Sequence, residues 1–456
     1  MRLSFTSGSL VSLAEILPKK LFFVSAPSKE SLQREMTKQS ETGPGVWFTV
    51  DNKLVYEPFC SDFGPLNLGK LYRFCQMLDI KLQDPKLVSS RIYVYTCQGP
   101  KKRSNTAVLI GAYAMIRLGL DWEQAFKRIS SAGEPFLPFR DANIGPCTYK
   151  LRIEQCLQGL GKALEFGWYD HENFDIKAYE KLEKVENGDV TVVVPGKFVH
   201  FSGPSDIPKD AHGYPALTPE HYVPIFRSLG VTDIIRLNNV CYSREKFIRA
   251  GFKHHELFFP DGSNPPDDVL DKFIEICEKA KGAIAVHCKA GLGRTGTCVG
   301  SYQMMKFKLT AAEAIGWMRI CRPGSVLGPQ QEFLEMMQPI MWKRGQAKLD
   351  SSKLDEFVDA VTKDQFIEAE AMDVDSTMDS MEAEDTAGDS LDVDDTEALT
   401  FAGRIVLGDS RYQSDESKLS WFTKLAMAAS SASAGADSSK LTQGDSKSFD
   451  ACPLTP

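Results

Sequence analysis

The 456-residue sequence lacks any uninterrupted run of about 18 apolar residues, the length that a membrane-spanning helix needs. Near the amino terminus, Glu15, Lys19 and Lys20 interrupt the apolar stretches, so we expect no signal peptide there. The eleven cysteines show no paired spacing, which favours reduced thiols in an intracellular protein over a disulfide framework. Because no group of residues has metal-ligand spacing, we predict neither a metal ion nor another cofactor.

Charge is distributed unevenly along the chain, whose net charge is −8. Residues 351–400 contain 2 Lys and 17 Asp or Glu, whereas residues 1–350 have a net charge of +7. The mildly basic part does not indicate nucleic-acid binding. The acidic block is followed by a segment rich in Ser, Ala and Asp over 428–456, and both are typical of disorder. We therefore predict a largely disordered tail, through which protein partners could be tethered.

Two segments of the sequence have the same order of features. RIYVYT (91–96) is followed by CQGPKKR (97–103), and AIAVH (283–287) is followed by CKAGLGR (288–294). Each has a short apolar run, a seven-residue loop opened by Cys and closed by Arg, a hydroxyl residue and an apolar helix. We interpret the likeness as two copies of one α/β domain, the alternative being chance similarity of two strand–helix units.

The remaining pattern completes an α/β organisation with a mixed, largely parallel central sheet and flanking helices in each domain. The charged segment 174–189 ends at Asn187-Gly188 and predicts a linker helix. After it we predict strands at 190–194, 197–202, 231–236 and 283–287, and helices at 218–229 and 266–281. The predicted units are a first domain over 1–173, the linker helix over 174–189, a second domain over 190–345 and the tail over 346–456.

The loop from Cys288 to Arg294 suits a phosphate group. Gly291 and Gly293 allow the backbone to curl, so that successive N–H groups point inward and form an anion-binding nest. A helix that begins near Arg294 adds the positive end of its dipole. Arg294 can bind two phosphate oxygens at once. The residues predicted to line the phosphate are Lys289, Ala290, Gly291, Leu292, Gly293 and Arg294.

The same electrostatic field favours the thiolate form of Cys288, which makes this residue the candidate nucleophile for a phosphocysteine intermediate. Thr295 can donate its hydroxyl to the departing sulfur in the second step. We expect His287 to brace the loop by hydrogen bonds rather than to transfer protons. The alternative is a buried structural cysteine, which would make the two glycines, Arg294 and Thr295 accidental.

The segment HCKAGLGRTG (287–296) resembles the signature of protein tyrosine and dual-specificity phosphatases. FFPDGSNPP and ICRPGSVLGPQQ, with PFRDA (138–142) and YEKLEKVENGD (179–189), are similar to segments of the cell-division-cycle 14 (mitotic-exit) phosphatases. The likeness covers roughly residues 45–335. It implies tandem dual-specificity-phosphatase-like domains, of which only the second is catalytic. It also implies nuclear, nucleolar and cytoplasmic locations, with centrosome or spindle as further sites.

The resemblance identifies further candidate residues. Asp261, in a Pro-Asp-Gly turn 27 residues before Cys288, is the expected general acid. Asp267 and Asp268 are weaker candidates because they begin a predicted helix. Gln330 is the expected orienter of the hydrolytic water, with a plain surface-loop glutamine as the alternative.

The first loop departs from this pattern. Thr96 precedes Cys97 where the second unit has a histidine, and Pro100 and Lys102 replace the two glycines. Pro100 also removes an N–H group that a nest would need. We expect a degenerate copy, although a second site at Cys97 and Arg103 remains open.

Several acidic residues indicate which kind of substrate the protein would bind. At helical spacing Glu180, Glu183 and Glu186 would share one face of the linker helix, and the first domain adds Glu134 and Asp141. The resemblance implies an acidic groove that binds a basic residue downstream of phosphoserine-proline, and so reversal of cyclin-dependent-kinase phosphorylation in cell-cycle or cytoskeletal control. The alternative for the glutamates is a solvated helix face.

Two other functions stay open. A phosphoinositide phosphatase has a similar loop, but it would carry a further lysine at the position of Leu292. A non-catalytic phosphoprotein-binding scaffold would not need nucleophile, arginine and acid together.

Overall fold

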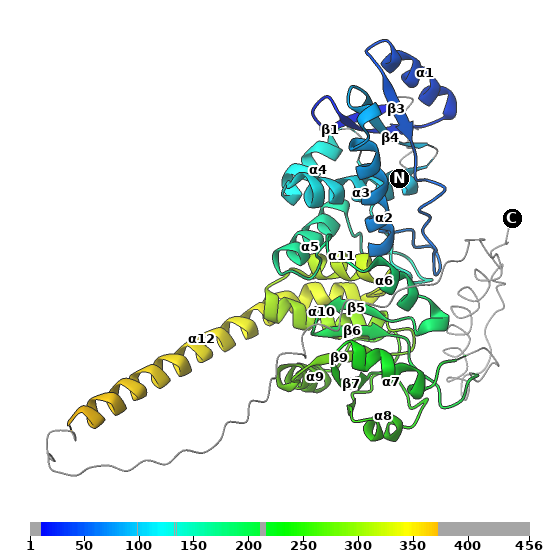
Figure 1. Cartoon of the computed structure of the whole chain (residues 1–456). Coiled ribbons are helices and arrows are strands. Elements are labelled where there is room, and N and C mark those ends of the chain that lie inside the picture. Colours follow the sequence, from blue (N-terminus) through cyan, green and yellow to red (C-terminus); the bar gives the residue numbers. More distant parts are fainter. Residues whose placement is uncertain (1–10, 98, 132, 134, 210–215, 373–456) are drawn as a thin grey trace, which may run out of the picture. The chain divides into compact units, whose positions relative to one another are not determined.

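The computed structural model describes residues 11–97, 99–131, 133, 135–209 and 216–372, with side chains up to residue 350 (Figure 1). Residues 346–372 of the predicted tail belong to a helix that continues from the second domain, so the predicted boundary at 345 is wrong. The rest of the tail and Glu134 lie outside the described residues. The elements of the first half are β1 (Ser12–Leu17), β2 (Leu21–Ala26), α1 (Lys29–Ser40), β3 (Gly45–Phe48), α2 (Leu68–Leu82), η1 (Pro85–Leu87), β4 (Arg91–Cys97), α3 (Pro100–Leu118), α4 (Trp122–Ser130) and α5 (Ile153–Glu165).

The second half begins after a short connecting segment, which contains α6 (Ile176–Leu182) and η2 (Val185–Asn187). Its elements are β5 (Thr191–Val194), β6 (Phe198–Phe201), α7 (Pro219–Ser228), β7 (Val231–Arg236), α8 (Glu245–Arg249), β8 (Lys253–Glu256), α9 (Asp267–Lys279), β9 (Ala283–His287), α10 (Gly293–Phe307), α11 (Ala311–Cys321) and α12 (Pro329–Met372). The four predicted strands and two predicted helices of this half are all present, with ends shifted by one or two residues at most.

The two sheets have corresponding strand orders. The first is β1-β2-β4-β3 and the second is β5-β6-β9-β7-β8, so the second sheet has one additional edge strand among the described residues. In each sheet an antiparallel pair comes first and all other pairs are parallel. The strand before each Cys-to-Arg loop, β4 or β9, lies inside its sheet. This correspondence confirms two α/β domains with mixed, largely parallel sheets.

The centre of the second sheet explains the position of its loop. All five residues of β9 are buried, as expected of a parallel strand that is covered on both faces. α10 is also buried from Gly293 to Met305, because α9, α11 and α12 pack against it. The loop between β9 and α10 is therefore held between two buried elements, at the carboxyl edge of the sheet where ligands of α/β proteins bind.

The connecting segment differs from the predicted single helix over 174–189. Asp175 caps α6, which ends at Leu182, and a separate 3₁₀ turn follows at Val185–Asn187. The backbone of Lys184 is extended, and Gly188 and Asp189 have φ values of 121° and 50°. These conformations interrupt the helical hydrogen bonds. Glu180, Glu183 and Glu186 consequently do not form the continuous helix face that their spacing predicted.

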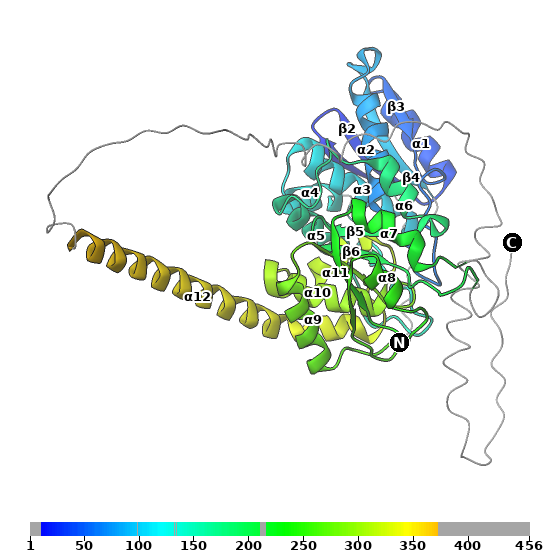
Figure 2. The same cartoon turned by 60° about the horizontal axis from the view of Figure 1, so that its bottom comes forward.

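The two halves pack through α5 and α11, which lie side by side in both Figure 1 and Figure 2. Two glycines make the close approach possible. A Cβ atom on Gly159 would lie 2.4 Å from the carbonyl oxygen of Glu313, and one on Gly316 would lie 2.8 Å from that of Gln155. Among the described residues, no helix is both long enough and apolar enough to cross a membrane.

Candidate active site

The loop between Cys288 and Leu292 curls so tightly that only glycine fits at one position. Gly291 has a φ of 64°, and a Cβ atom there would lie 2.1 Å from the carbonyl oxygen of Phe201. A Cβ atom on Gly293 would lie 2.8 Å from Oε1 of Gln330. The two glycines that the sequence singled out are therefore sites of close backbone approach as well as of curvature.

Four successive carbonyl groups of the loop are held on its outer side. Nδ1 of His287 donates to the oxygen of Cys288 at 2.9 Å, and the N–H of Gly203 donates to that of Lys289 at 2.9 Å. Arg322 donates from Nη2 to Ala290 at 2.9 Å and from Nε to Gly291 at 3.1 Å.

This arrangement fixes where the N–H groups of the loop point. In a trans peptide the C=O and the following N–H point in opposite directions. The N–H groups that follow the four carbonyls consequently face the concave side, as a phosphate-binding nest requires. They belong to Lys289, Ala290, Gly291 and Leu292.

Arg294 lies at the start of α10 and is 3% exposed. Its Nη1 donates to the carbonyl oxygens of Leu237 at 3.3 Å and Phe259 at 2.9 Å, which fixes the plane of the guanidinium. Its Nε has no protein partner among the described residues. The side chain is thus oriented by two carbonyls, Nε remains for an anion, and Nη2 contacts the carboxylate of Asp261.

Asp261 lies on the loop after β8 and is exposed. Its Oδ1 is 3.1 Å from Nη2 of Arg294 and also accepts a hydrogen bond from the N–H of Gly262 at 3.1 Å. Sequence reasoning put Asp261 and Arg294 in one site, and the structure brings their side chains into contact. Asp267 and Asp268 instead form the first turn of α9.

His287 belongs to a buried hydrogen-bonded chain. Because its Nδ1 donates to a carbonyl, its Nε2 accepts, and the hydroxyl of Tyr242 donates to it at 2.8 Å. The Tyr242 oxygen in turn accepts from Nε2 of His254 at 2.7 Å. Burial lowers the pKa of both His287 and His254 to about 3, so both rings are neutral at physiological pH. A neutral His287, whose tautomer is fixed by these hydrogen bonds, is suited to supporting the loop.

Thr295 and Gln330 border the loop from the α10 and α12 sides. The hydroxyl of Thr295 is buried and has no protein partner among the described residues. The side-chain amide of Gln330 donates from Nε2 to the carbonyl oxygen of Ser263 at 3.1 Å and accepts at Oε1 from the N–H of Leu327 at 3.1 Å. Gln331 accepts from Arg319 at 2.6 Å. Of the two glutamines, Gln330 therefore contacts the loop that carries Asp261.

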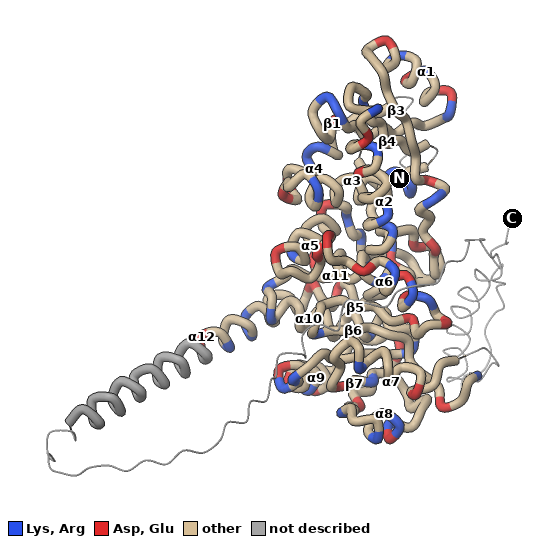
Figure 3. The backbone as a smooth tube through the Cα atoms, viewed as in Figure 1, with Lys and Arg blue, Asp and Glu red and all other residues tan. Residues whose placement is uncertain are grey.

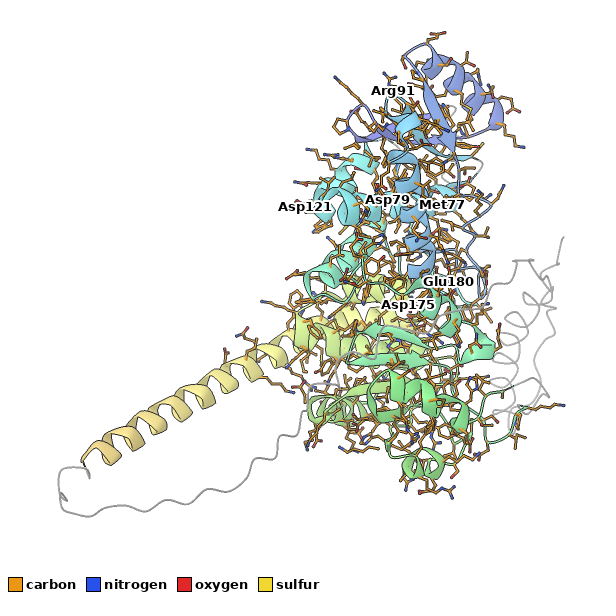
Figure 4. The ribbon with its side chains drawn as sticks, viewed as in Figure 1. Met77, Asp79, Arg91, Asp121, Asp175 and Glu180 are labelled. Atoms are coloured by element: carbon orange, nitrogen blue, oxygen red, sulfur yellow. The ribbon has the colours of Figure 1, made fainter. Side chains whose placement is uncertain are left out.

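The acidic residues of the connecting segment have basic and polar neighbours. Glu180, labelled in Figure 4, pairs with Arg73 of α2 at 2.8 Å. Acidic and basic residues lie next to each other around α6 (Figure 3). Glu183 accepts a hydrogen bond from Nδ2 of Asn67 at 2.5 Å. Burial raises the pKa of the Glu183 carboxyl to about 7. That these glutamates line a groove that binds a basic residue of the substrate stays a prediction.

Asp141 is 2% exposed, and its Oδ2 accepts a hydrogen bond from the N–H of Gly328 at 2.8 Å. This buried contact differs from the open groove position that the sequence suggested for Asp141. A recognition role for this residue also stays a prediction, and the position of Glu134 lies outside the described residues.

The corresponding loop of the first half has a different shape. Pro100 occupies the first turn of α3, so this helix starts three residues after Cys97, whereas α10 starts five residues after Cys288. The carboxylate of Asp51 accepts hydrogen bonds from the N–H of Cys97 and the hydroxyl of Thr96, both at 3.1 Å. A shortened loop whose first N–H is already bonded to a carboxylate is poorly suited to bind phosphate.

Sequence reasoning did not find three residues that support the loop. They are Asp189, which pairs with Arg322 at 2.5 Å, Tyr242, and Gly203, whose Cβ would lie 2.6 Å from the carbonyl oxygen of Cys288. Asp189 and Gly203 stand next to recognisable turn residues, but no signal in the sequence marks Tyr242.

Two family models match the chain. The dual specificity protein phosphatase N-terminal half matches residues 15–163, and the dual specificity phosphatase catalytic domain matches residues 267–340. The second match contains the Cys288–Arg294 loop and Gln330. Fold, loop geometry and models together define the dual specificity phosphatase class.

Three vertebrate relatives identify the family within this class. Human dual specificity protein phosphatase CDC14A is 47% identical over 340 residues, covering 74% of this chain and 56% of that protein. Zebrafish (Danio rerio) CDC14AB is 47% identical over 339 residues, covering 74% and 54%. Human CDC14C is 44% identical over 299 residues, covering 66% and 67%. The chain belongs to the CDC14 family of dual specificity protein phosphatases. It spans 54–67% of the length of these three relatives.

Proposed function

We propose that this chain is a cysteine-dependent protein phosphatase that hydrolyses phosphoserine, phosphothreonine and phosphotyrosine. The observation that carries the proposal is the nest of four outward-held carbonyl groups, with Cys288 at its entrance and Arg294 at the start of the following helix. Such a nest neutralises a phosphate dianion through N–H groups, the guanidinium and the helix dipole together. Membership of the CDC14 family supports the same reaction.

In the first step the Cys288 thiolate attacks phosphorus and the bond to the substrate oxygen breaks. Asp261 donates its proton to that leaving oxygen, so the substrate departs as an alcohol or phenol. The transferred phosphoryl group remains on sulfur, bound by the nest and by Arg294. Nη2 of Arg294, which contacts Asp261 at 3.1 Å, then serves phosphate oxygens as well.

In the second step water attacks phosphorus and the bond to sulfur breaks, which releases inorganic phosphate and restores the thiolate. Asp261, now ionised, accepts the proton of the water. The amide of Gln330 orients that water, since it lies between the Asp261 loop and Gly293. The hydroxyl of Thr295 donates to the departing sulfur.

For the substrate we propose phosphoserine-proline sites followed by a basic residue, as left by cyclin-dependent kinases. Glu180 and Glu183 are the residues that would attract the basic side chain, although Arg73 and Lys70 reduce their field. Leu292 supports a protein substrate over a phosphoinositide, because a highly charged headgroup would lack a counter-charge at this position.

Cys288→Ser tests the reaction class on a phosphoserine-proline peptide. Because an alcohol does not ionise near neutral pH, turnover should fall below about 1% of wild type while phosphate binding persists. Arg294→Lys should be nearly as inactive, since ammonium cannot replace the bidentate guanidinium. Cys97→Ser is the matched control and should keep wild-type turnover.

A parallel assay on soluble phosphoinositide separates the two substrate classes. If the phosphoinositide were turned over faster than the peptide, phosphoinositides would replace proteins as the proposed substrate class. Full activity of Cys288→Ser would overturn the nucleophile. A wild-type chain that turns over neither substrate would leave phosphoprotein binding as the function to test.

A further inference from the structure

Asp141 connects the first half of the chain to the turn before Gln330. Its Oδ2 accepts a hydrogen bond from the N–H of Gly328 at 2.8 Å, and the residue is 2% exposed. The contact joins residues 187 positions apart. Gly328 immediately precedes α12, whose second residue is Gln330. A carboxylate that binds one backbone N–H in a buried position restricts the turn to which that N–H belongs.

The turn Ser325–Gly328 is conformationally strained and depends on contacts from outside. Val326 has a φ of 63°, an uncommon value for a β-branched residue, and it is fully buried. Such a conformation persists only where several neighbours enforce it. Arg319 donates to the carbonyl oxygens of Ser325 at 3.0 Å and Val326 at 2.9 Å.

On the loop side, the N–H of Val326 donates to the carbonyl oxygen of Leu292 at 3.3 Å. From the first half of the chain, Asp141 supplies the hydrogen bond to the N–H of Gly328.

The position of the Gln330 amide follows from this turn. The N–H of Leu327 donates to Oε1 of Gln330 at 3.1 Å, and the N–H of Gln330 donates to the carbonyl oxygen of Leu327 at 3.1 Å. The same Oε1 is 2.8 Å from where a Cβ of Gly293 would be. A shift of Leu327 and Gly328 would therefore move the amide relative to the catalytic loop.

We infer that Asp141 is a positioning residue for hydrolysis of the phosphocysteine intermediate: by binding the N–H of Gly328, it holds the turn that places Gln330. The inference rests on the proposed function, in which Gln330 orients the attacking water. It assigns the first half of the chain a part in the second chemical step. The proposed mechanism gives Gln330 no part in the first step, so the second step is the one that should slow.

The test uses rapid mixing of the full chain with p-nitrophenyl phosphate, a small substrate that does not extend to the acidic residues. Asp141→Ala removes the acceptor. We expect the nitrophenol burst to keep its rate, the following steady-state rate to fall roughly 10- to 100-fold, and trapped phosphoenzyme to accumulate. Asp141→Asn keeps a carbonyl oxygen for Gly328 and should restore most of the steady-state rate.

Tyr149→Phe is the matched control. It removes the hydroxyl that donates to Glu335 at 2.7 Å, in the same contact between the first half and α12, without affecting Gly328. It should leave both steps unchanged. Loss of fold or of half–half packing would reduce the burst amplitude and the steady-state rate together, because less protein would be active, and so would not change the steady-state rate per active site.

Two results would overturn the inference. One is an unchanged ratio of second-step to first-step rates in Asp141→Ala. The other is an Asp141→Asn variant as impaired as Asp141→Ala, which would mean that the charge matters rather than the acceptor. Failure of the proposed function is recognised separately, because wild type would then form no trapped phosphoenzyme at all.

Discussion

The carboxylate of Asp189 and the guanidinium of Arg322 form an ion pair, with Oδ2 and Nη2 2.5 Å apart. The same guanidinium donates to the carbonyl oxygens of Ala290 and Gly291 in the phosphate-binding loop. Asp189 ends the connecting segment directly before the second sheet. One arginine therefore ties the entry of the second half to the outer side of its loop, and it keeps two carbonyl groups away from the anion.

Replacing Arg322 by Met should weaken the binding of inorganic phosphate or vanadate and lower stability. It would leave two loop carbonyls and a largely buried Asp189 without their donor, at a cost of about 1–4 kcal/mol. Isothermal titration with vanadate and urea unfolding measure the two effects. Arg344→Met removes an exposed pair with Asp271 and should change stability by less than about 1 kcal/mol. Unchanged vanadate affinity in Arg322→Met would contradict the support role.

Asp261→Asn should reduce turnover of a phosphoserine peptide by roughly 10²–10⁴, because an alkoxide leaves poorly without a proton. The loss should be smaller for an aryl phosphate, whose leaving group needs less protonation. The ratio of kcat/KM values for the two substrates is the measurement. Asp267→Asn, in the first turn of α9, is the control. Equal losses on both substrates would mean that another group supplies the proton.

Buried histidines should make the protein labile to acid. Burial lowers the pKa values of His200, His254 and His287 to about 3, from an ordinary value of 6.5. The unfolded state therefore binds more protons than the folded state between these two values, and the free energy of unfolding falls as pH drops below 6.5. At pH 5.5 each ring contributes a loss of about 1.4 kcal/mol.

His200→Leu tests this loss at one ring. Both ring nitrogens of His200 lack a protein partner among the described residues, so the substitution breaks no hydrogen bond of the structure. It should remove about a third of the histidine-dependent loss, which urea unfolding at pH 7.5 and 5.5 measures. His221→Leu, at an exposed position, should leave the pH dependence as it is. An unaltered slope in His200→Leu would exclude a buried neutral ring.

The preference for a basic residue after the phosphoserine should increase with pH. The pKa of Glu183 is about 7, so its carboxyl is mostly neutral at pH 6 and mostly ionised at pH 8. At each pH, the kcat/KM of a lysine-containing peptide is divided by that of its norleucine analogue. Titrations that affect both peptides equally then cancel. The preference should amount to about 0.5–2 kcal/mol at pH 8 and weaken with added salt.

Glutamine at both Glu180 and Glu183 should abolish the preference and its pH dependence while activity on an aryl phosphate persists. Glu186→Gln changes an exposed residue of the following 3₁₀ turn and serves as the control. If the double variant kept the full preference, basic residues would have to bind elsewhere, and Asp141 and Glu134 would be the next candidates.

Although β1, β2, β3 and β8 went unpredicted, the local sequence was sufficient to predict β4, β5, β6, β7 and β9, the repeated unit and the proposed chemistry of the loop. These depend on neighbouring residues: the curl of the loop needs Gly291 and Gly293, and the helix after it needs only the apolar pattern of α10. The same local logic explains Pro100, whose ring is suited to a first helical turn and so shortens the other loop.

Local pattern failed where two conformations are close in free energy. The charged segment 174–189 continues after Leu182 with the good helix formers Glu183, Lys184 and Glu186, yet its helix ends at Leu182. The amide of Val190 donates to the carbonyl oxygen of Leu182 at 2.8 Å, and Asp189 binds Arg322 instead of continuing the turn. These contacts outweigh a helix propensity worth only tenths of a kcal/mol per residue, about 0 to 0.7.

Which distant residues support the site depended on the tertiary fold. Tyr242 binds His287, Asp189 binds Arg322, and Asp141 binds Gly328. The sequence separations between these partners follow no helical or strand periodicity. The reason is physical: one buried hydrogen bond depends on the final placement of two backbones to within tenths of an ångström, and sequence spacing does not specify that placement. The residues proposed to react could therefore be recognised in the sequence, whereas those that hold them were recognised only in the fold.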